Sequence, residues 1–194
     1  MTLPERPQEI GLPNLWDRDH WEPIVRAYVE TGTVISMHVG SSGGYPVPPR
    51  RPVAAQLRHV RPVVPRRLQR MALVALPLDY PELKLAMSEG GIGWVPTLID
   101  RLDNMVDRSG YGRGWDIHPA DVLRRNFWFC TIDDPSTIAL RHVIGVGHIM
   151  LETDYPHGDG TWPDLRPRAS ATGHKPGTAP LASAAVVSDT PESL

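Results

Sequence analysis

Apolar runs alternate with amphipathic stretches over the first 164 residues of this chain. Four of the runs, each followed by polar or glycine-rich residues, predict short buried strands at residues 33–37, 83–88, 126–131 and 144–151.

Apolar side chains at helical spacing fill the intervals between these runs. Asp19 is expected to cap a helix that closes at Gly32, and the apolar positions of residues 94–108 fall on one helical face. Pro135 is expected to open a further helix that runs towards His142. This alternation of helix and strand favours an α/β fold in which parallel strands are joined by right-handed crossovers.

Side chains that could bind a metal or move a proton stand directly after three of the predicted strands. They are His38, Glu89 and Asp154, and parallel strands would bring them to one rim of the sheet. The apolar run before Asp154 fixes its backbone, and Pro156 stops the strand from continuing, so the carboxylate is presented rigidly. On this stretch alone, an ordinary turn with a solvated Asp154 is the alternative interpretation.

Four phrases of the sequence carry a family resemblance. They are H-V-G-S-S-G from residue 38, S-E-G-G-I-G-W-V-P from residue 88, R-N-F-W from residue 125, and E-T-D-Y-P-H from residue 152 with T-W-P from residue 161. Together they resemble the amidohydrolase-related family, more narrowly its branch around aminocarboxymuconate-semialdehyde decarboxylase. The resemblance covers residues 7–48 and 78–164.

This resemblance implies a (βα)8 TIM barrel that binds one divalent metal ion, expected to be zinc. By the same matching, His38 is the metal ligand of the fifth strand, and Asp154 is the eighth-strand ligand that also accepts a proton. A bound metal lowers the pKa of its water towards roughly 7, which suits a nearby carboxylate as proton acceptor.

Glu89 occupies the sixth-strand position at which many relatives carry a histidine. It is expected to take part in catalysis, by polarising the substrate or binding through a water, although an imidazole's proton transfer at neutral pH is lost there. The alternative is that Glu89 caps the glycine-rich turn and pairs with an arginine.

His157 and Trp94 are candidate substrate-binding residues. His157 could contact a substrate above the metal, and Trp94 and Trp162 could line a pocket for an aromatic or unsaturated acid. A solvated loop histidine, and a packing role for Trp94 and for Trp162, are the alternatives.

The expected reaction is hydrolysis of a small carboxylated substrate, with decarboxylation by a carboxy-lyase of the same family as the alternative. A complete barrel needs about 250 residues, whereas this chain has 194. The expected fold is therefore the C-terminal half of a barrel, about strands 5 to 8, incomplete, binding metal weakly and inactive alone. A non-enzymatic half-barrel that forms a homo-oligomer or associates with another chain is a further alternative.

Two segments depart from the pattern of residues 1–164. Residues 49–77 are rich in arginine and proline, and no acidic residue occurs from residue 31 to residue 78. This interruption indicates compensating frameshifts, with a natural basic insertion as the alternative. Residues 165–194 contain few large apolar side chains and are expected to form a disordered tail.

Composition limits the partners of the chain. A net charge of -2 and a pI near 6.4 give no general attraction to nucleic acid. The single cysteine, Cys130, lies in an apolar run and is expected to be buried, without a disulfide within the chain. Without a recognisable signal peptide or long apolar run, the protein is expected to be cytoplasmic, with no membrane partner.

Overall fold

The computed structural model describes residues 2–4, 6–15, 17–38, 41, 76–110, 112–132 and 135–157. The arginine- and proline-rich segment lies outside the described residues except for its last two positions, and so does the predicted tail. Strands and helices follow one another as β1 (Thr2–Pro4), η1 (Pro7–Ile10), α1 (Arg18–Thr31), β2 (Ile35–His38), β3 (Leu85–Ser88), α3 (Trp94–Ser109), α4 (Pro119–Asn126), β4 (Phe127–Thr131), α5 (Pro135–Ile138), α6 (Arg141–Ile144), η3 (Val146–His148) and β5 (Ile149–Leu151).

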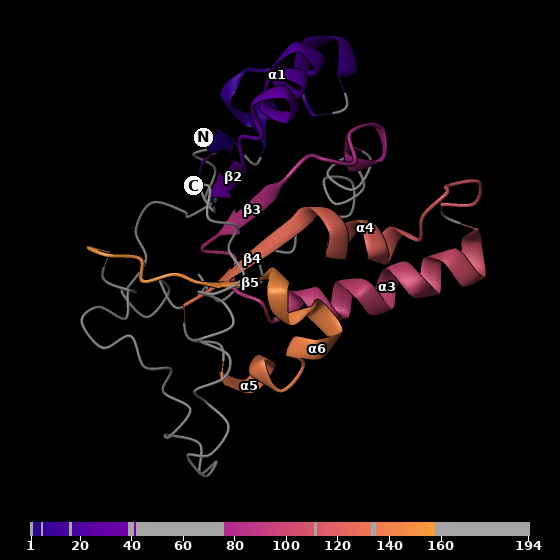
Figure 1. Ribbon diagram of the computed structural model, residues 1–194, viewed down its shortest axis with the longest axis vertical. Helices are drawn as coiled ribbons and strands as arrows, with labels where there is room; N and C mark the ends of the chain where they lie inside the picture. The colour runs from indigo at the N-terminus through magenta and orange to yellow at the C-terminus, as the bar shows by residue number, and fades with distance from the viewer. Residues whose placement is uncertain are drawn as a thin grey trace, which may run out of the picture.

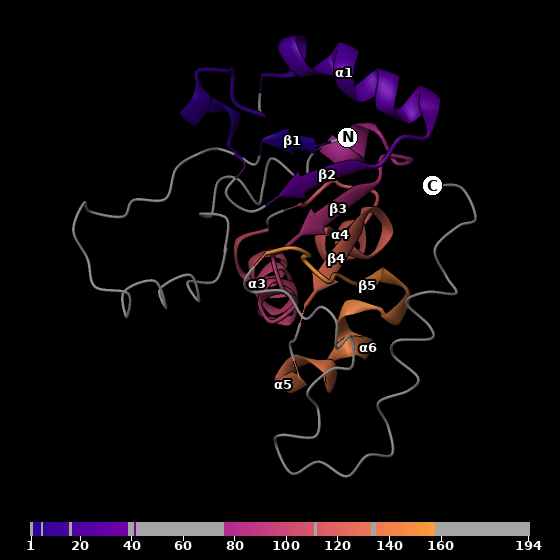
Figure 2. The same cartoon turned by 90° about the vertical axis from the view of Figure 1, so that its left-hand side faces the viewer.

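The strands form one parallel sheet in the order β1-β2-β3-β4-β5, so each strand pairs with its neighbours in the sequence. This confirms the predicted α/β fold with parallel strands. Figure 2 shows the strands side by side from β1 to β5, with α1 at the β1 end of the sheet and α5 and α6 at the β5 end. All arrows point to the same side, from which the chain leaves β5 (Figure 1).

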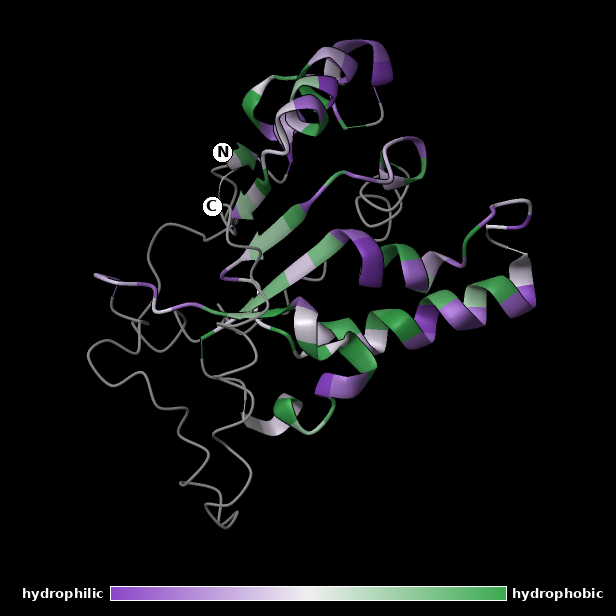
Figure 3. Cartoon of the chain, in the orientation of Figure 1, coloured by the Kyte–Doolittle hydropathy of each residue, from purple (hydrophilic) through white to green (hydrophobic). Residues whose placement is uncertain are grey.

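The hydrophobic core lies between one face of the sheet and the helices. Ile35, Met37, Leu85, Phe129 and Ile149 alternate along the strands and are buried on this face. Helix α3 contributes an apolar stripe to the same cluster, and the stripe is visible as green segments between purple ones in Figure 3. The core therefore fixes the strands from one side and leaves the alternate residues for other roles.

Helix α1 confirms the predicted closure at Gly32, which takes a left-handed conformation with φ 65°. The predicted cap was wrong, because Asp17 and not Asp19 accepts a hydrogen bond from the backbone amide of His20, at 3.2 Å. A cap residue accepts from the amide two or three positions on, which places Asp19 inside the first turn.

The described residues contain five strands, where the sequence predicted four. Strand β1 is only three residues long and ends in Pro4, so it carries no apolar periodicity, yet it pairs in parallel with β2. Which strands of a barrel these five represent stays a prediction.

The predicted strand over residues 144–151 was also wrong in extent, because only Ile149–Leu151 is extended. Gly145, with φ 103°, separates α6 from the short helical turn η3 that precedes β5. Similarly, the helix predicted from Pro135 begins there but is divided into α5 and α6.

Helix α4 was not predicted. It is short, and its cap is the imidazole of His118, whose Nδ1 accepts a hydrogen bond from the backbone amide of Ala120 at 3.2 Å. In the described part of the chain, no helix is long and apolar enough to cross a membrane.

Asn126 joins the end of α4 to the loop that precedes β3. Its side chain is fully buried, and its Nδ2 donates to the carbonyls of Pro81 and Leu83 at 2.9 and 2.7 Å. Its Oδ1 accepts from Nε of Arg125 at 2.8 Å. These bonds fix the entry into β3, and therefore the placement of Glu89 at its far end.

We predict that Asn126→Ala destabilises the protein by about 1–3 kcal/mol, because it leaves buried carbonyl groups unsatisfied. Urea unfolding followed by circular dichroism measures the change. Asn104→Ala on the exposed face of α3 is the matched control and should stay within about 0.5 kcal/mol of the wild type. Equal unfolding midpoints for the two variants would contradict the assigned role.

Candidate functional site

His38 and Glu89 meet at the carboxyl ends of neighbouring strands. His38 is the last residue of β2 and lies opposite Ser88 in the parallel register, so the next residue of that loop, Glu89, follows immediately. The Nε2 atom of His38 is 2.9 Å from Oε1 of Glu89. The alternative prediction from the sequence was that Glu89 pairs with an arginine. In the described structure the partner of Glu89 is instead the imidazole of His38.

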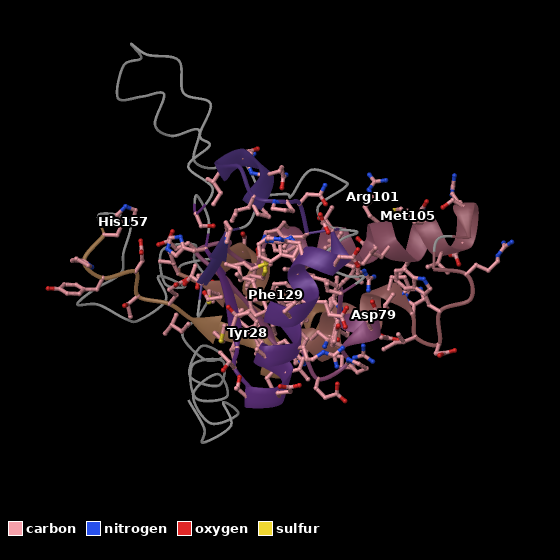
Figure 4. All side chains as sticks on the ribbon, turned by 90° about the horizontal axis from the view of Figure 1, so that it is seen from above. Tyr28, Asp79, Arg101, Met105, Phe129 and His157 are labelled. Carbon is pink, nitrogen blue, oxygen red and sulfur yellow. The ribbon has the colours of Figure 1, made fainter. Side chains whose placement is uncertain are left out.

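Asp154 and His157 form a second pair in the segment after β5. Nδ1 of His157 is 2.8 Å from Oδ2 of Asp154, within a single turn of the chain. The Asp154 side chain is largely covered, at 11% exposure, whereas that of His157 is 68% exposed. Figure 4 shows His157 towards the outside of the molecule, well away from the core residue Phe129.

Both acidic residues have an unusual backbone. Glu89 has φ 56° and Asp154 has φ 52°, the left-handed region that residues other than glycine seldom occupy. In the described residues these are the two non-glycine positions with positive φ. Backbone strain of this kind is concentrated at functional sites, where surrounding contacts hold it in place.

The two carboxyl groups bond to one another. Burial raises the pKa of Glu89, and its hydrogen bond to Asp154 raises it further, against the charge of His38. Burial also acts to raise the pKa of Asp154, but hydrogen bonds from Glu89 and His157 outweigh it and the pKa is lowered. Glu89 therefore holds a proton more readily than Asp154, and the hydrogen bond between the two carboxyls favours one proton shared by the pair.

The same geometry fits a metal ion. Ligand atoms of Glu89, Asp154 and His157 all lie within 4.8 Å of one another. Two carboxylate oxygens and an imidazole nitrogen are a donor set that zinc accepts. Among the described residues, the ion-pair partners of Glu89 and Asp154 are imidazoles, so no arginine or lysine already supplies the charge that a divalent cation would bring.

The residues predicted from the sequence therefore come together, but in a different grouping. His38, predicted as a metal ligand, contacts Glu89 and stands outside the group of three. Glu89 and His157, predicted for catalysis and substrate binding, lie inside it with Asp154. These roles stay predictions.

Trp94 lies against the core. Its Nε1 donates to the carbonyl of Gly90 at 3.0 Å, and its ring meets Phe129 edge to face at a centroid distance of 5.5 Å. The structure thus gives the indole the packing contacts considered as the alternative, and its part in substrate binding stays a prediction. Trp162 lies outside the described residues.

Glu152 was given no role from the sequence, although it belongs to the phrase that contains Asp154. Its Oε2 accepts a hydrogen bond from the backbone amide of Glu89 at 2.7 Å. The sequence held one signal for this role, namely that Glu152 stands two positions before Asp154. Residues two apart in an extended segment point to the same side.

Cys130 lies beneath these residues and is buried, as predicted. Burial first, then the charge of Glu152 and a hydrogen bond to it, raise the pKa of the thiol to about 12. Because the pKa of this thiol is higher in the folded than in the unfolded protein, Cys130 contributes to stability in full below pH 9.0. This contribution is lost as the pH rises from there towards 12.

We therefore expect Cys130 in the native protein at pH 8 to react with an aromatic disulfide reagent roughly a thousandfold more slowly than in urea, because so little thiolate is present. Thiolate release followed by absorbance measures both rates, with Cys130→Ser as the blank. Equal rates in native and unfolded protein would contradict the burial and pKa assigned to this thiol.

Comparison with known proteins finds a matching family and similar solved structures. Residues 9–176 match the amidohydrolase family. Among solved structures, the chain is similar to a crystal structure of an amidohydrolase from Mycobacterium avium subsp. paratuberculosis K-10, at 22% sequence identity and a TM-score of 0.59. The match covers 82% of this chain and 43% of that chain, so this chain spans less than half its length. This likeness shows a shared fold. No curated protein matches the chain.

Proposed function

This chain belongs to the amidohydrolase family, and on that basis we propose that it acts as a metal-dependent hydrolase on a small carboxylated substrate. The observation that carries the proposal is the convergence of Glu89, Asp154 and His157 after the ends of two strands of a parallel sheet. Sites at the carboxyl ends of parallel strands are the rule for enzymes built on such sheets.

Glu89, Asp154 and His157 would hold one divalent ion, with zinc the first candidate because of its affinity for mixed oxygen and nitrogen ligands. Such an ion, when bound, lowers the pKa of a coordinated water and polarises a carbonyl group. The strained backbones of Glu89 and Asp154 support this assignment, because they direct two carboxyls to one point.

Asp154 is best suited to accept a proton. Its pKa is lowered, despite the effect of burial, by bonds from Glu89 and His157, so it is ionised at neutral pH. A carboxylate within hydrogen-bond reach of a reacting water acts as a general base. His38, which contacts Glu89, holds that carboxyl in place.

The imidazoles of His38 and His157 support the proposal that the substrate carries a carboxylate. The side chain of His38 is 45% exposed and that of His157 is 68% exposed. An exposed imidazole can donate a hydrogen bond to a substrate carboxylate through a ring N–H, and in His157 this would be the ring nitrogen that does not hold the ion. The narrower likeness to a decarboxylase branch stays a prediction at this point.

We predict that Asp154→Asn and His157→Ala each weaken Zn²⁺ binding by roughly tenfold or more, because each removes a ligand that converges on the ion. Isothermal titration calorimetry on the metal-depleted full chain measures this. Asp100→Asn, on the exposed face of α3, is the matched control and should bind like the wild type. Binding unaffected by either site variant would place the ion elsewhere.

The reaction itself is tested with the zinc-loaded protein and a panel of small carboxylated amides, lactones and unsaturated acids, with products identified by mass spectrometry. We expect hydrolysis products, and their loss in Asp154→Asn. Release of carbon dioxide instead would make the protein a carboxy-lyase. No turnover would agree with the expectation from chain length that the protein is inactive alone. No turnover together with a discrete complex in size-exclusion chromatography would favour the non-enzymatic half-barrel.

A further inference from the structure

Glu152 connects two loops that come from strands on either side of β4. It stands just after β5, and its carboxylate accepts the backbone amide of Glu89, which stands just after β3 and is 63 positions away in the sequence. The distance of 2.7 Å is short for a backbone donor and is typical of a charge-assisted hydrogen bond.

Glu152 is itself held firmly. Its backbone amide donates to the carbonyl of Thr131, the last residue of β4, at 3.0 Å. This bond continues the pairing of β4 with β5 by one residue beyond the strand. It fixes the backbone of Glu152, so the carboxylate can move only by changes of side-chain rotamer. The carboxylate is therefore a fixed point on the sheet rather than a group on a free loop.

A row of polar side chains leads from Glu152 across the sheet. Glu152 raises the pKa of the Cys130 thiol and Ser88 lowers it, so both act on this thiol, and Oγ of Ser88 lies 3.2 Å from Oγ of Ser36. The row spans β2, β3 and β4 on the face opposite the hydrophobic core. Glu152 ends this row at the level of Glu89.

We propose that Glu152 is a positioning residue that clamps the turn after β3 and thereby sets the separation of the Glu89 and Asp154 carboxyls. Asp154 is two residues beyond Glu152, so the clamp ties both acids to the same anchored segment. Glu89 has a left-handed backbone, which needs an outside contact to hold it, and its amide finds that contact in Glu152. The inference rests on the proposed function in so far as the two acids hold a metal.

Two variants test the clamp. Glu152→Ala removes the acceptor, whereas Glu152→Gln retains an amide oxygen that can accept the Glu89 amide without charge. The matched control is Glu82→Gln, an exposed glutamate before β3. Urea unfolding is measured for all three, and if Glu152→Ala fails to fold, Glu152→Gln against the control decides.

The first readout needs no metal. In the metal-free full chain, hydrogen exchange and NMR shifts report on the Glu89 amide directly. We expect exchange about tenfold faster in Glu152→Ala, a smaller acceleration in Glu152→Gln and none in the control, since a charge-assisted bond of ordinary strength is lost or weakened. An unchanged Glu89 amide in both variants would overturn the clamp.

The second readout is Zn²⁺ affinity by calorimetry, together with the visible spectrum of the Co²⁺ form. We expect Glu152→Ala to weaken binding about 10–100-fold, as loss of a group that orients a ligand does, and Glu152→Gln to recover part of it. Equal loss in both variants, with an unchanged Glu89 amide, would make Glu152 a ligand and refute positioning. If the wild type binds neither metal, the proposed function fails, while the amide measurement still decides the clamp.

Discussion

The close approach of the Glu89 and Asp154 carboxyls is the constraint on which the rest of the site depends. Two acids that both ionise at this separation repel one another, so the pair must hold a proton or a cation. The pKa of Glu89 is raised and that of Asp154 is lowered, as expected for two carboxyls that share one proton. Each imidazole then has a place beside one acid, His38 at Glu89 and His157 at Asp154.

The parallel sheet holds the two carboxyls close together despite the strain in their backbones. Parallel pairing in sequential order delivers the ends of β2, β3 and β5 to one edge, and the buried face of the strands keeps them there. The left-handed backbones of Glu89 and Asp154 cost roughly 1–3 kcal/mol each. A loop without support from the sheet would relieve this strain by changing its backbone conformation. Anchors such as Asn126 and Glu152 lie where the loops leave the sheet.

Sequence patterns predicted those parts of the fold that rest on local chemistry. Apolar runs revealed β2, β3 and β4, and the glycine after α1 revealed its end, because each depends on its own residues. Strand β1 was missed because three residues carry no periodicity and it exists only through pairing with β2. In the same way, His38, Glu89, Asp154 and His157 could be chosen as chemically apt, but their grouping depends on backbone angles and sheet register that no local pattern reveals.

The two halves of the site differ in how far apart their members lie along the chain. Asp154 and His157 are three positions apart and bond within one turn, whereas Glu89 joins them only through the assembled sheet. In the unfolded chain Asp154 and His157 still stand three positions apart, so the proposed ion would meet part of its ligand set there as well. Any ion that binds here stabilises the folded protein only by the difference between its affinities for the two states, so the contribution of Glu89 decides how far an ion protects this fold against unfolding.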